Sequence, residues 1–106
     1  LMAIAFRDAA NGIAVGVEGT VLATGDGGAS WEVMPKATNE HLFDLTWDGA
    51  SWVAVGDKGE LLKGDAQARQ WQILRASAND RGWHTEIVST SSHYLIAGEN
   101  FAVIQR

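Results

Sequence analysis

Internal repetition is the feature that most restricts how this chain can fold. Three landmarks recur at one offset of 40 residues: Val15-Gly16 as Val55-Gly56, Gly19 as Gly59, and Trp31 as Trp71. A third copy of the first landmark, Ala97-Gly98, follows after a further 42 residues. A period of about 40 to 50 residues is that of a propeller blade built from four short strands. The repeat therefore predicts an all-β fold made of propeller-type blades.

Short apolar strands separated by turn residues recur within each repeat. The expected strands are 3–6, 13–15, 20–24 and 30–34, then 41–47, 52–55, 60–63 and 70–74, then 83–90, 94–97 and 101–105. Twelve glycines, five tryptophans and a single proline among 106 residues favour tight turns and aromatic packing over helix bundles. We predict four-stranded antiparallel blades at about 1–38 and 39–78, with three strands of another blade at 79–106. A small antiparallel sandwich is the alternative.

One turn carries a recognisable motif, Ser/Thr-x-Asp-x-Gly-x-Ser/Thr-Trp, whose positions are filled by Thr24, Asp26, Gly28, Ser30 and Trp31. Asp26 is expected to accept hydrogen bonds from backbone amides two or three residues on, and Gly28 permits positive φ. Trp31 would cover the turn, so that Trp31→Ala is expected to cost about 3–5 kcal/mol. A calcium loop would need further carboxylates at alternate positions and a terminal Glu. We therefore interpret Asp26 as structural rather than as a metal ligand.

The corresponding turn of the second repeat keeps only one motif residue, Trp71. The other motif positions are occupied by Gly64, Ala66, Ala68 and Gln70. The sequence therefore predicts that the packing tryptophan is retained there while the hydrogen-bonding chemistry of the turn has changed.

The whole pattern resembles a known family of repeat propellers. Phe6-x-Asp8, Gly12-Ile-Ala-Val-Gly16, Gly19-Thr-Val-Leu and the Thr24–Trp31 motif together resemble the photosystem II assembly and stability factor family. That resemblance implies a seven-bladed, non-catalytic scaffold that binds other proteins, often outside the cytoplasm. Through the Thr24–Trp31 motif alone, an Asp-box, the chain is also similar to bacterial neuraminidase-type repeats. These imply sialidases and glycan-active enzymes on six-bladed propellers, and fold alone does not decide between the two.

Charge and composition exclude several classes of function. The formal net charge is −5 and the pI is about 5.0, whereas a nucleic-acid-binding surface normally needs a basic patch. The chain has no cysteine, so it has neither a disulfide framework nor a thiolate metal site. No apolar run reaches membrane-spanning length, and the first residues lack the pattern of a signal peptide. We expect a soluble protein that neither binds nucleic acid nor inserts into a membrane. Its compartment stays open, because a removed export signal would leave no trace.

No catalytic constellation is found in the sequence. The three histidines, His41, His84 and His93, are scattered, and no HExxH motif occurs. A sialidase site would need clustered arginines with a Tyr/Glu pair, but Tyr94 is the one tyrosine and lies within a predicted strand. We therefore predict no catalytic residues, no metal site and no cofactor.

A binding face is expected at the end of the blades opposite the Asp-box turn. Two kinds of loop share that end: the connections from one blade to the next, and the turns between the second and third strands of each blade. The candidate residues of this face are His41, Lys58, Arg75, Asn79, Arg81 and Trp83. Arg and Trp are favoured at the energetic centres of protein interfaces. In the alternative interpretation, Trp83 packs at the start of a strand and its neighbours form a solvated loop.

A propeller needs four to eight blades to close into a ring. With fewer blades, the outer faces of the end blades and an edge strand stay unpaired. We therefore expect either a fragment of a longer propeller or self-association into a dimer or ring. The function that these residues favour is a non-catalytic scaffold that binds a protein partner. A glycan-binding or sialidase-like glycosidase propeller fragment is the alternative.

Overall fold

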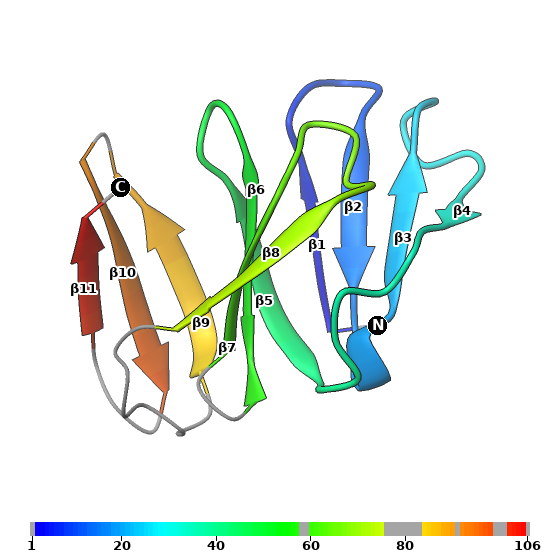
Figure 1. Cartoon of the computed structure of the whole chain (residues 1–106). Coiled ribbons are helices and arrows are strands. Elements are labelled where there is room, and N and C mark those ends of the chain that lie inside the picture. Colours follow the sequence, from blue (N-terminus) through cyan, green and yellow to red (C-terminus); the bar gives the residue numbers. More distant parts are fainter. Residues whose placement is uncertain (1, 58–59, 76–83, 91, 99–101, 106) are drawn as a thin grey trace.

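The computed structural model describes residues 2–57, 60–75, 84–90, 92–98 and 102–105, and it folds them into three antiparallel sheets that stand side by side (Figure 1). Blade 1 consists of β1 (Ala3–Phe6), β2 (Gly12–Val15), β3 (Val21–Thr24) and β4 (Glu32–Val33). Blade 2 consists of β5 (Leu42–Trp47), β6 (Trp52–Gly56), β7 (Glu60–Gly64) and β8 (Trp71–Arg75). Blade 3 consists of β9 (His84–Ser89), β10 (His93–Gly98) and β11 (Ala102–Gln105).

The all-β architecture expected from the repeat is confirmed, with two four-stranded antiparallel sheets and three strands of another. The strand that differs most from its expected range is β4, which covers only Glu32–Val33 instead of 30–34. It begins late because Ser30 and Trp31 direct their side-chain hydrogen bonds back into the preceding turn. A short 3-10 helix, η1 (Val17–Gly19), lies between β2 and β3. No helix among the described residues is long and apolar enough to cross a membrane.

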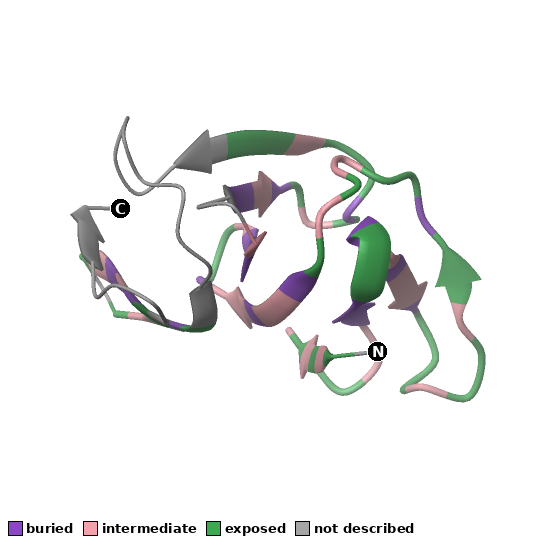
Figure 2. Ribbon diagram, turned by 90° about the horizontal axis from the view of Figure 1, so that it is seen from below, coloured by how far each residue is buried: buried purple, intermediate pink, exposed green. Residues whose placement is uncertain are grey.

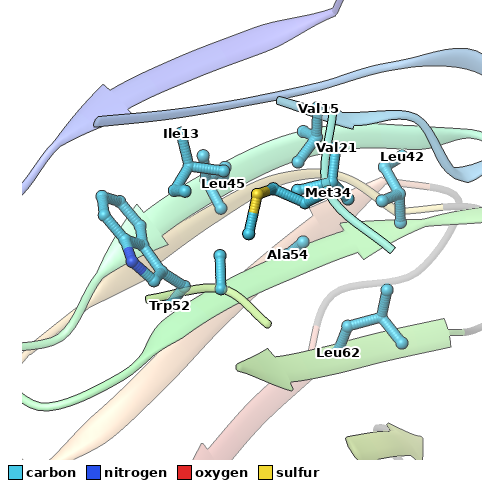
Figure 3. Close-up of a cluster of buried hydrophobic side chains, with 10 residues drawn as sticks. Ile13, Val15, Val21, Met34, Leu42, Leu45, Trp52, Ala54 and Leu62 are labelled. Carbon is cyan, nitrogen blue, oxygen red and sulfur yellow. The ribbon is translucent and has the colours of Figure 1, made fainter. Parts of the chain in front are cut away.

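The first core lies between blade 1 and blade 2 (Figure 3). Because successive side chains of a strand point to opposite faces, β2 directs Ile13 and Val15 toward blade 2 while Ala14 points to the other face. Strand β6 directs Trp52 back into the same core, where it is 1% exposed. Met34, which follows β4, lies in the middle of this cluster. The two blades are therefore joined mainly by apolar packing.

The second core, between blade 2 and blade 3, combines apolar packing with carboxylate hydrogen bonds. Its buried apolar members are Val53, Val55, Leu61, Ile87, Tyr94 and Ile96. The hydroxyl of Tyr94 donates a hydrogen bond to Oδ2 of Asp48, which lies in the β5–β6 turn. The amide of Ile87 donates to Oδ2 of Asp44 at 2.9 Å. Two carboxylates of blade 2 thus hold blade 3 in register.

In blades 1 and 2 burial is highest in the second strands, β2 and β6, and lower in the strands at the sheet edges. All four residues of β2 are buried, whereas both residues of β4 are exposed (Figure 2). Two of the repeated glycines lie where backbone segments come too close for a side chain. A Cβ on Gly56 would lie 2.0 Å from the carbonyl oxygen of His41, and one on Gly19, at φ +76°, would lie 1.9 Å from that of Thr38. The glycine landmarks therefore mark close contacts at the ends of strands.

Candidate functional site

Two turns form one end of the first two blades. Turn 1 (Thr24–Trp31) joins β3 to β4, and turn 2 (Gly64–Trp71) joins β7 to β8, both at the upper end of the sheets in Figure 1. Each turn ends with a tryptophan whose indole nitrogen donates to a backbone carbonyl three residues earlier. The bond runs from Trp31 to Gly28 in turn 1 and from Trp71 to Ala68 in turn 2, and it measures 3.1 Å in both. The two turns thus have the same closing bond.

Turn 1 is held by a network among its hydroxyl and carboxylate side chains. The hydroxyl of Thr24 donates to Oδ1 of Asp26 at 2.8 Å and accepts a hydrogen bond from the amide of Gly28 at 3.0 Å. Asp26 accepts the amide of Ser30 on Oδ1 at 2.9 Å and its hydroxyl on Oδ2 at 2.6 Å. The carboxylate thus receives the amide of Ser30, four residues on, and the amide of Ala29, at the expected distance of three residues, also stabilises its charge. The amide two residues on, that of Gly28, donates to Thr24 instead.

These hydrogen bonds stabilise the charged form of Asp26. The hydroxyl of Ser30 contributes most, followed by the amide of Ser30 and the hydroxyl of Thr24, and together they lower the pKa of Asp26 to about 2. Both oxygens of the carboxylate accept hydrogen bonds from residues of the same turn. This geometry supports the structural interpretation of Asp26.

Trp31 is half-buried and meets Phe6 edge to face, with the ring centroids 6.3 Å apart. Its indole nitrogen donates back to Gly28 of the turn, and the residue stays partly exposed. Burial of Trp31 therefore contributes less to the free energy of unfolding than burial of a fully enclosed tryptophan would.

Turn 2 uses a carboxylate that the motif comparison missed. Asp65, one position before the aligned motif position, accepts hydrogen bonds from the amides of Arg69 at 2.8 Å and Gln70 at 3.3 Å. Ala68 adopts the left-handed conformation, with φ +58°, that Gly28 adopts in turn 1 with φ +99°. A second indole, that of Trp52 in β6, donates to the carbonyl oxygen of Ala66 at 3.1 Å. An acidic residue directly after the strand-ending glycine is the sequence signal for this arrangement.

A pocket of about 170 Å³ lies between turn 1 and turn 2. Its apolar base is formed by Ile13, Ala23 and Met34. Its polar residues come from both blades and include Arg7, Asn11 and Glu32 from blade 1, with Gln67 and Arg69 from blade 2. Thr24 and Gly25 of turn 1 and Ala66 of turn 2 complete the walls. The pocket therefore depends on the packing of the two blades against each other.

The two arginines of the pocket are held differently. Nη1 of Arg7 donates to Oδ2 of Asp8 at 3.1 Å, and its guanidinium carbon lies 5.8 Å from the ring centroid of Trp47. The Nε atom of Arg7 is buried and has no acceptor among the described residues. Nη2 of Arg69 lies 3.9 Å from Oε1 of Glu32, and both of these side chains are mostly exposed. Arg7 is thus fixed in place, whereas Arg69 is loosely paired.

The structure describes only part of the face predicted from the sequence. His41 is exposed, and its Nδ1 accepts a hydrogen bond from the amide of Glu18 at 3.0 Å, so it also links blade 2 to η1. Arg75 ends β8, but its side chain lies outside the described residues, as do Lys58, Asn79, Arg81 and Trp83. The proposed grouping of these residues therefore stays a prediction. Within the described ranges, no group of three or more His, Asp or Glu residues is placed to hold a metal ion.

Comparison with known proteins decides the family. The sequence model of the family described as photosynthesis system II assembly factor YCF48 matches residues 1–100. The chain belongs to this family. No match is found among the curated proteins. Among solved structures, the fold is similar to one titled "YCF48 bound to D1 peptide", with a TM-score of 0.80 and 20% sequence identity. The similarity covers 96% of this chain and 36% of the YCF48 chain.

Proposed function

We propose that this chain is part of a non-catalytic propeller scaffold that binds a segment of another protein. The observation that carries this proposal is the match to the YCF48 family over residues 1–100. The YCF48 structure of the same fold holds a peptide of D1, which makes an extended peptide the first ligand class to test. The chain spans 36% of the length of that YCF48 chain.

Two surfaces are candidates for the partner. One is the pocket between turn 1 and turn 2, whose residues come from both described blades. The other is the opposite face, where His41 lies and where the sequence predicts Lys58, Arg75, Asn79, Arg81 and Trp83. The pocket is favoured because it combines an apolar base with several polar groups, the composition typical of binding sites.

Binding of peptides that tile the D1 sequence tests the proposal. We expect a subset of overlapping synthetic peptides to bind the 106-residue chain in isothermal titration calorimetry, and scrambled peptides of equal composition not to bind. Absence of binding by every D1 peptide, together with hydrolysis of an artificial sialoside or binding on a glycan array, would support the glycan-active alternative instead.

We also propose that the chain self-associates through the outer face of blade 1. Ile4, Phe6 and Val33 on this face are 57%, 42% and 77% exposed. Ile4 pairs with Ala14 as Leu45 pairs with Ala54 in blade 2, yet Leu45 is only 6% exposed because blade 1 covers it. An apolar sheet face of this kind favours a second copy of the chain as its cover.

Light scattering coupled to size exclusion tests this second proposal. We expect the mass of the wild type to rise with protein concentration and the mass of Ile4→Lys to stay that of a monomer. Ala50→Lys, which changes an exposed turn residue, is the matched control and should behave as the wild type does. A wild-type monomer at every concentration would contradict self-association.

A further inference from the structure

We propose that the pocket between turn 1 and turn 2 binds one apolar side chain of an extended peptide together with a carboxylate next to it. This inference rests on the proposed peptide-binding function and assigns it a site and a ligand chemistry. Pockets for small molecules of drug size usually enclose about 300–1,000 Å³. The volume here, about 170 Å³, is smaller than that range and suits a single side chain.

The base of the pocket suits an apolar group. Ile13 and Met34 belong to the core between the blades, and each is 3% exposed. Core packing fixes their positions and leaves the partly exposed Ala23 as the main apolar surface that an entering side chain meets. An anchor residue buried in a preformed pocket supplies much of the affinity of peptide complexes.

The charged residues around the pocket favour an anionic group on the ligand. The pocket is lined by two arginines, Arg7 and Arg69, and one carboxylate, that of Glu32, although the whole chain has a net charge of −5. Asp8, the partner of Arg7, is already engaged by the amides of Ala10 and Asn11. The lining itself therefore carries two guanidinium groups and one carboxylate, and the charged Asp8 lies beside Arg7 outside the lining.

Both arginines can bind a ligand carboxylate at small cost in free energy. Arg7 is held over Trp47 and its side chain is 26% exposed, so little conformational freedom is lost when its exposed part binds a ligand. Arg69 contacts Glu32 only at 3.9 Å and in water, and exposed pairs of this kind contribute little. A ligand carboxylate can therefore replace Glu32 at small cost. A Glu or Asp side chain and a free chain terminus supply the same chemistry.

Gly25 allows the pocket to be blocked without disturbing the fold. It is exposed and adopts no left-handed conformation, and a Cβ there would meet only Oδ1 of Asn11, at 3.8 Å. Gly25→Leu therefore places a side chain in the pocket. Ala29→Leu is the matched control, because Ala29 is exposed in the same turn and does not line the pocket.

Defined peptides test the inference independently of D1. The probes are acetylated Gly-Ser-Leu-Glu-Ser-Gly amide, the same peptide with Gln in place of Glu, and acetyl-Gly-Ser-Leu with a free terminus. Binding is followed by amide chemical shifts in ¹⁵N-labelled protein up to millimolar peptide. We expect shifts at Gly25 and Ala66 with the acidic peptides, about tenfold weaker binding in Gly25→Leu, and unchanged binding in Ala29→Leu.

Substitution of Arg69 tests whether a carboxylate on the ligand contributes to binding. Arg69→Gln should weaken the acidic peptides several-fold and leave the Gln peptide unaffected, while Lys36→Gln, outside the pocket, should change neither. A preference between the Glu peptide and the free terminus identifies the source of the carboxylate. Shifts at neither Gly25 nor Ala66, or equal binding of the Glu and Gln peptides, would overturn the inference. If D1 peptides bind but ignore Gly25→Leu, the function stands and this site is wrong.

Discussion

Turn 1 and turn 2 share the closing bond and an aspartate that accepts backbone amides, but they differ in how much buried apolar surface supports them. At the start of turn 1, Thr24 of β3 pairs with Gly12 of β2. At the start of turn 2 the glycine is on the other strand of the pair, since Gly64 of β7 pairs with Trp52 of β6. The hydroxyl of Thr24 begins a polar network in turn 1. The indole of Trp52 gives turn 2 a second hydrogen-bond donor and a large apolar surface.

The difference shows that one turn shape can rest on polar or on apolar contacts. The Asp26 network lies largely in water, where each hydrogen bond replaces one made with solvent and contributes little net. In turn 2, Trp52 is 1% exposed and Ala68 is fully buried, so the same shape is fixed by burial. We therefore expect turn 2 to contribute more to the free energy of unfolding than turn 1 does.

The largest effect is expected when turn 2 loses its buried indole. Trp52→Ala removes a buried tryptophan and leaves the carbonyl of Ala66 without its donor, which should cost about 3–5 kcal/mol in the free energy of unfolding. Trp31→Ala should cost only about 2 kcal/mol, less than the sequence suggested, because Trp31 is half-buried. Urea unfolding at neutral pH measures both. Equal losses would mean that the two turns are stabilised alike.

A second test adds a methyl group under the indole of turn 2. A Cβ on Gly64 would lie 2.7 Å from the ring of Trp71, whose nitrogen is fixed by its bond to Ala68. Gly64→Ala should therefore cost about 1–3 kcal/mol. The control is Gly25→Ala in turn 1, where the nearest atom is 3.8 Å away and no clash results. A midpoint unchanged in Gly64→Ala would show that the indole moves freely.

These two turns also show how far sequence reasoning could go. The polar network of turn 1 joins residues at most four positions apart, so its motif could be read locally. The bond from Trp52 to Ala66 spans 14 positions and depends on the pairing of β6 with β7. Asp65 was missed because its carboxylate acts from a position shifted by one relative to the motif.

The repeat predicted the blades because landmarks such as Gly19 and Gly56 stand where backbone segments approach closely. The pocket could not be predicted in the same way. Arg7 and Arg69 are not motif residues, and both line the pocket only because blade 1 packs against blade 2 through the apolar core. A site formed by packing between repeats carries no local sequence signal.

A third test uses pH to separate the polar turn from the apolar one. The pKa of Asp26 falls from 3.8 to about 2 in the folded chain, so near pH 3 the unfolded state binds more protons than the folded state. The stabilisation is complete above pH 4 and is lost as the pH falls from about 4 to about 2. Asp26→Asn should lack this component of the pH dependence of the urea midpoint. Asp8, whose pKa is also lowered, mainly by the side chain of Asn11, is present in both proteins and cancels in the difference. Parallel curves for the two proteins would contradict the assignment.

The smallest effect is expected from exchanging the left-handed residues of the two turns. Ala68 adopts φ +58°, a conformation that costs a non-glycine residue about 1 kcal/mol, so Ala68→Gly relieves strain. The same change removes a fully buried methyl group, worth about 0.8 kcal/mol. These contributions nearly cancel, and the net change should be within about 0.5 kcal/mol. In turn 1, Gly28→Ala gains only contacts at 3.7 Å or more and should cost about 1 kcal/mol, because the half-buried position cannot offset the strain at φ +99°. A clear gain in stability from Ala68→Gly would mean that backbone strain outweighs packing even at the buried turn.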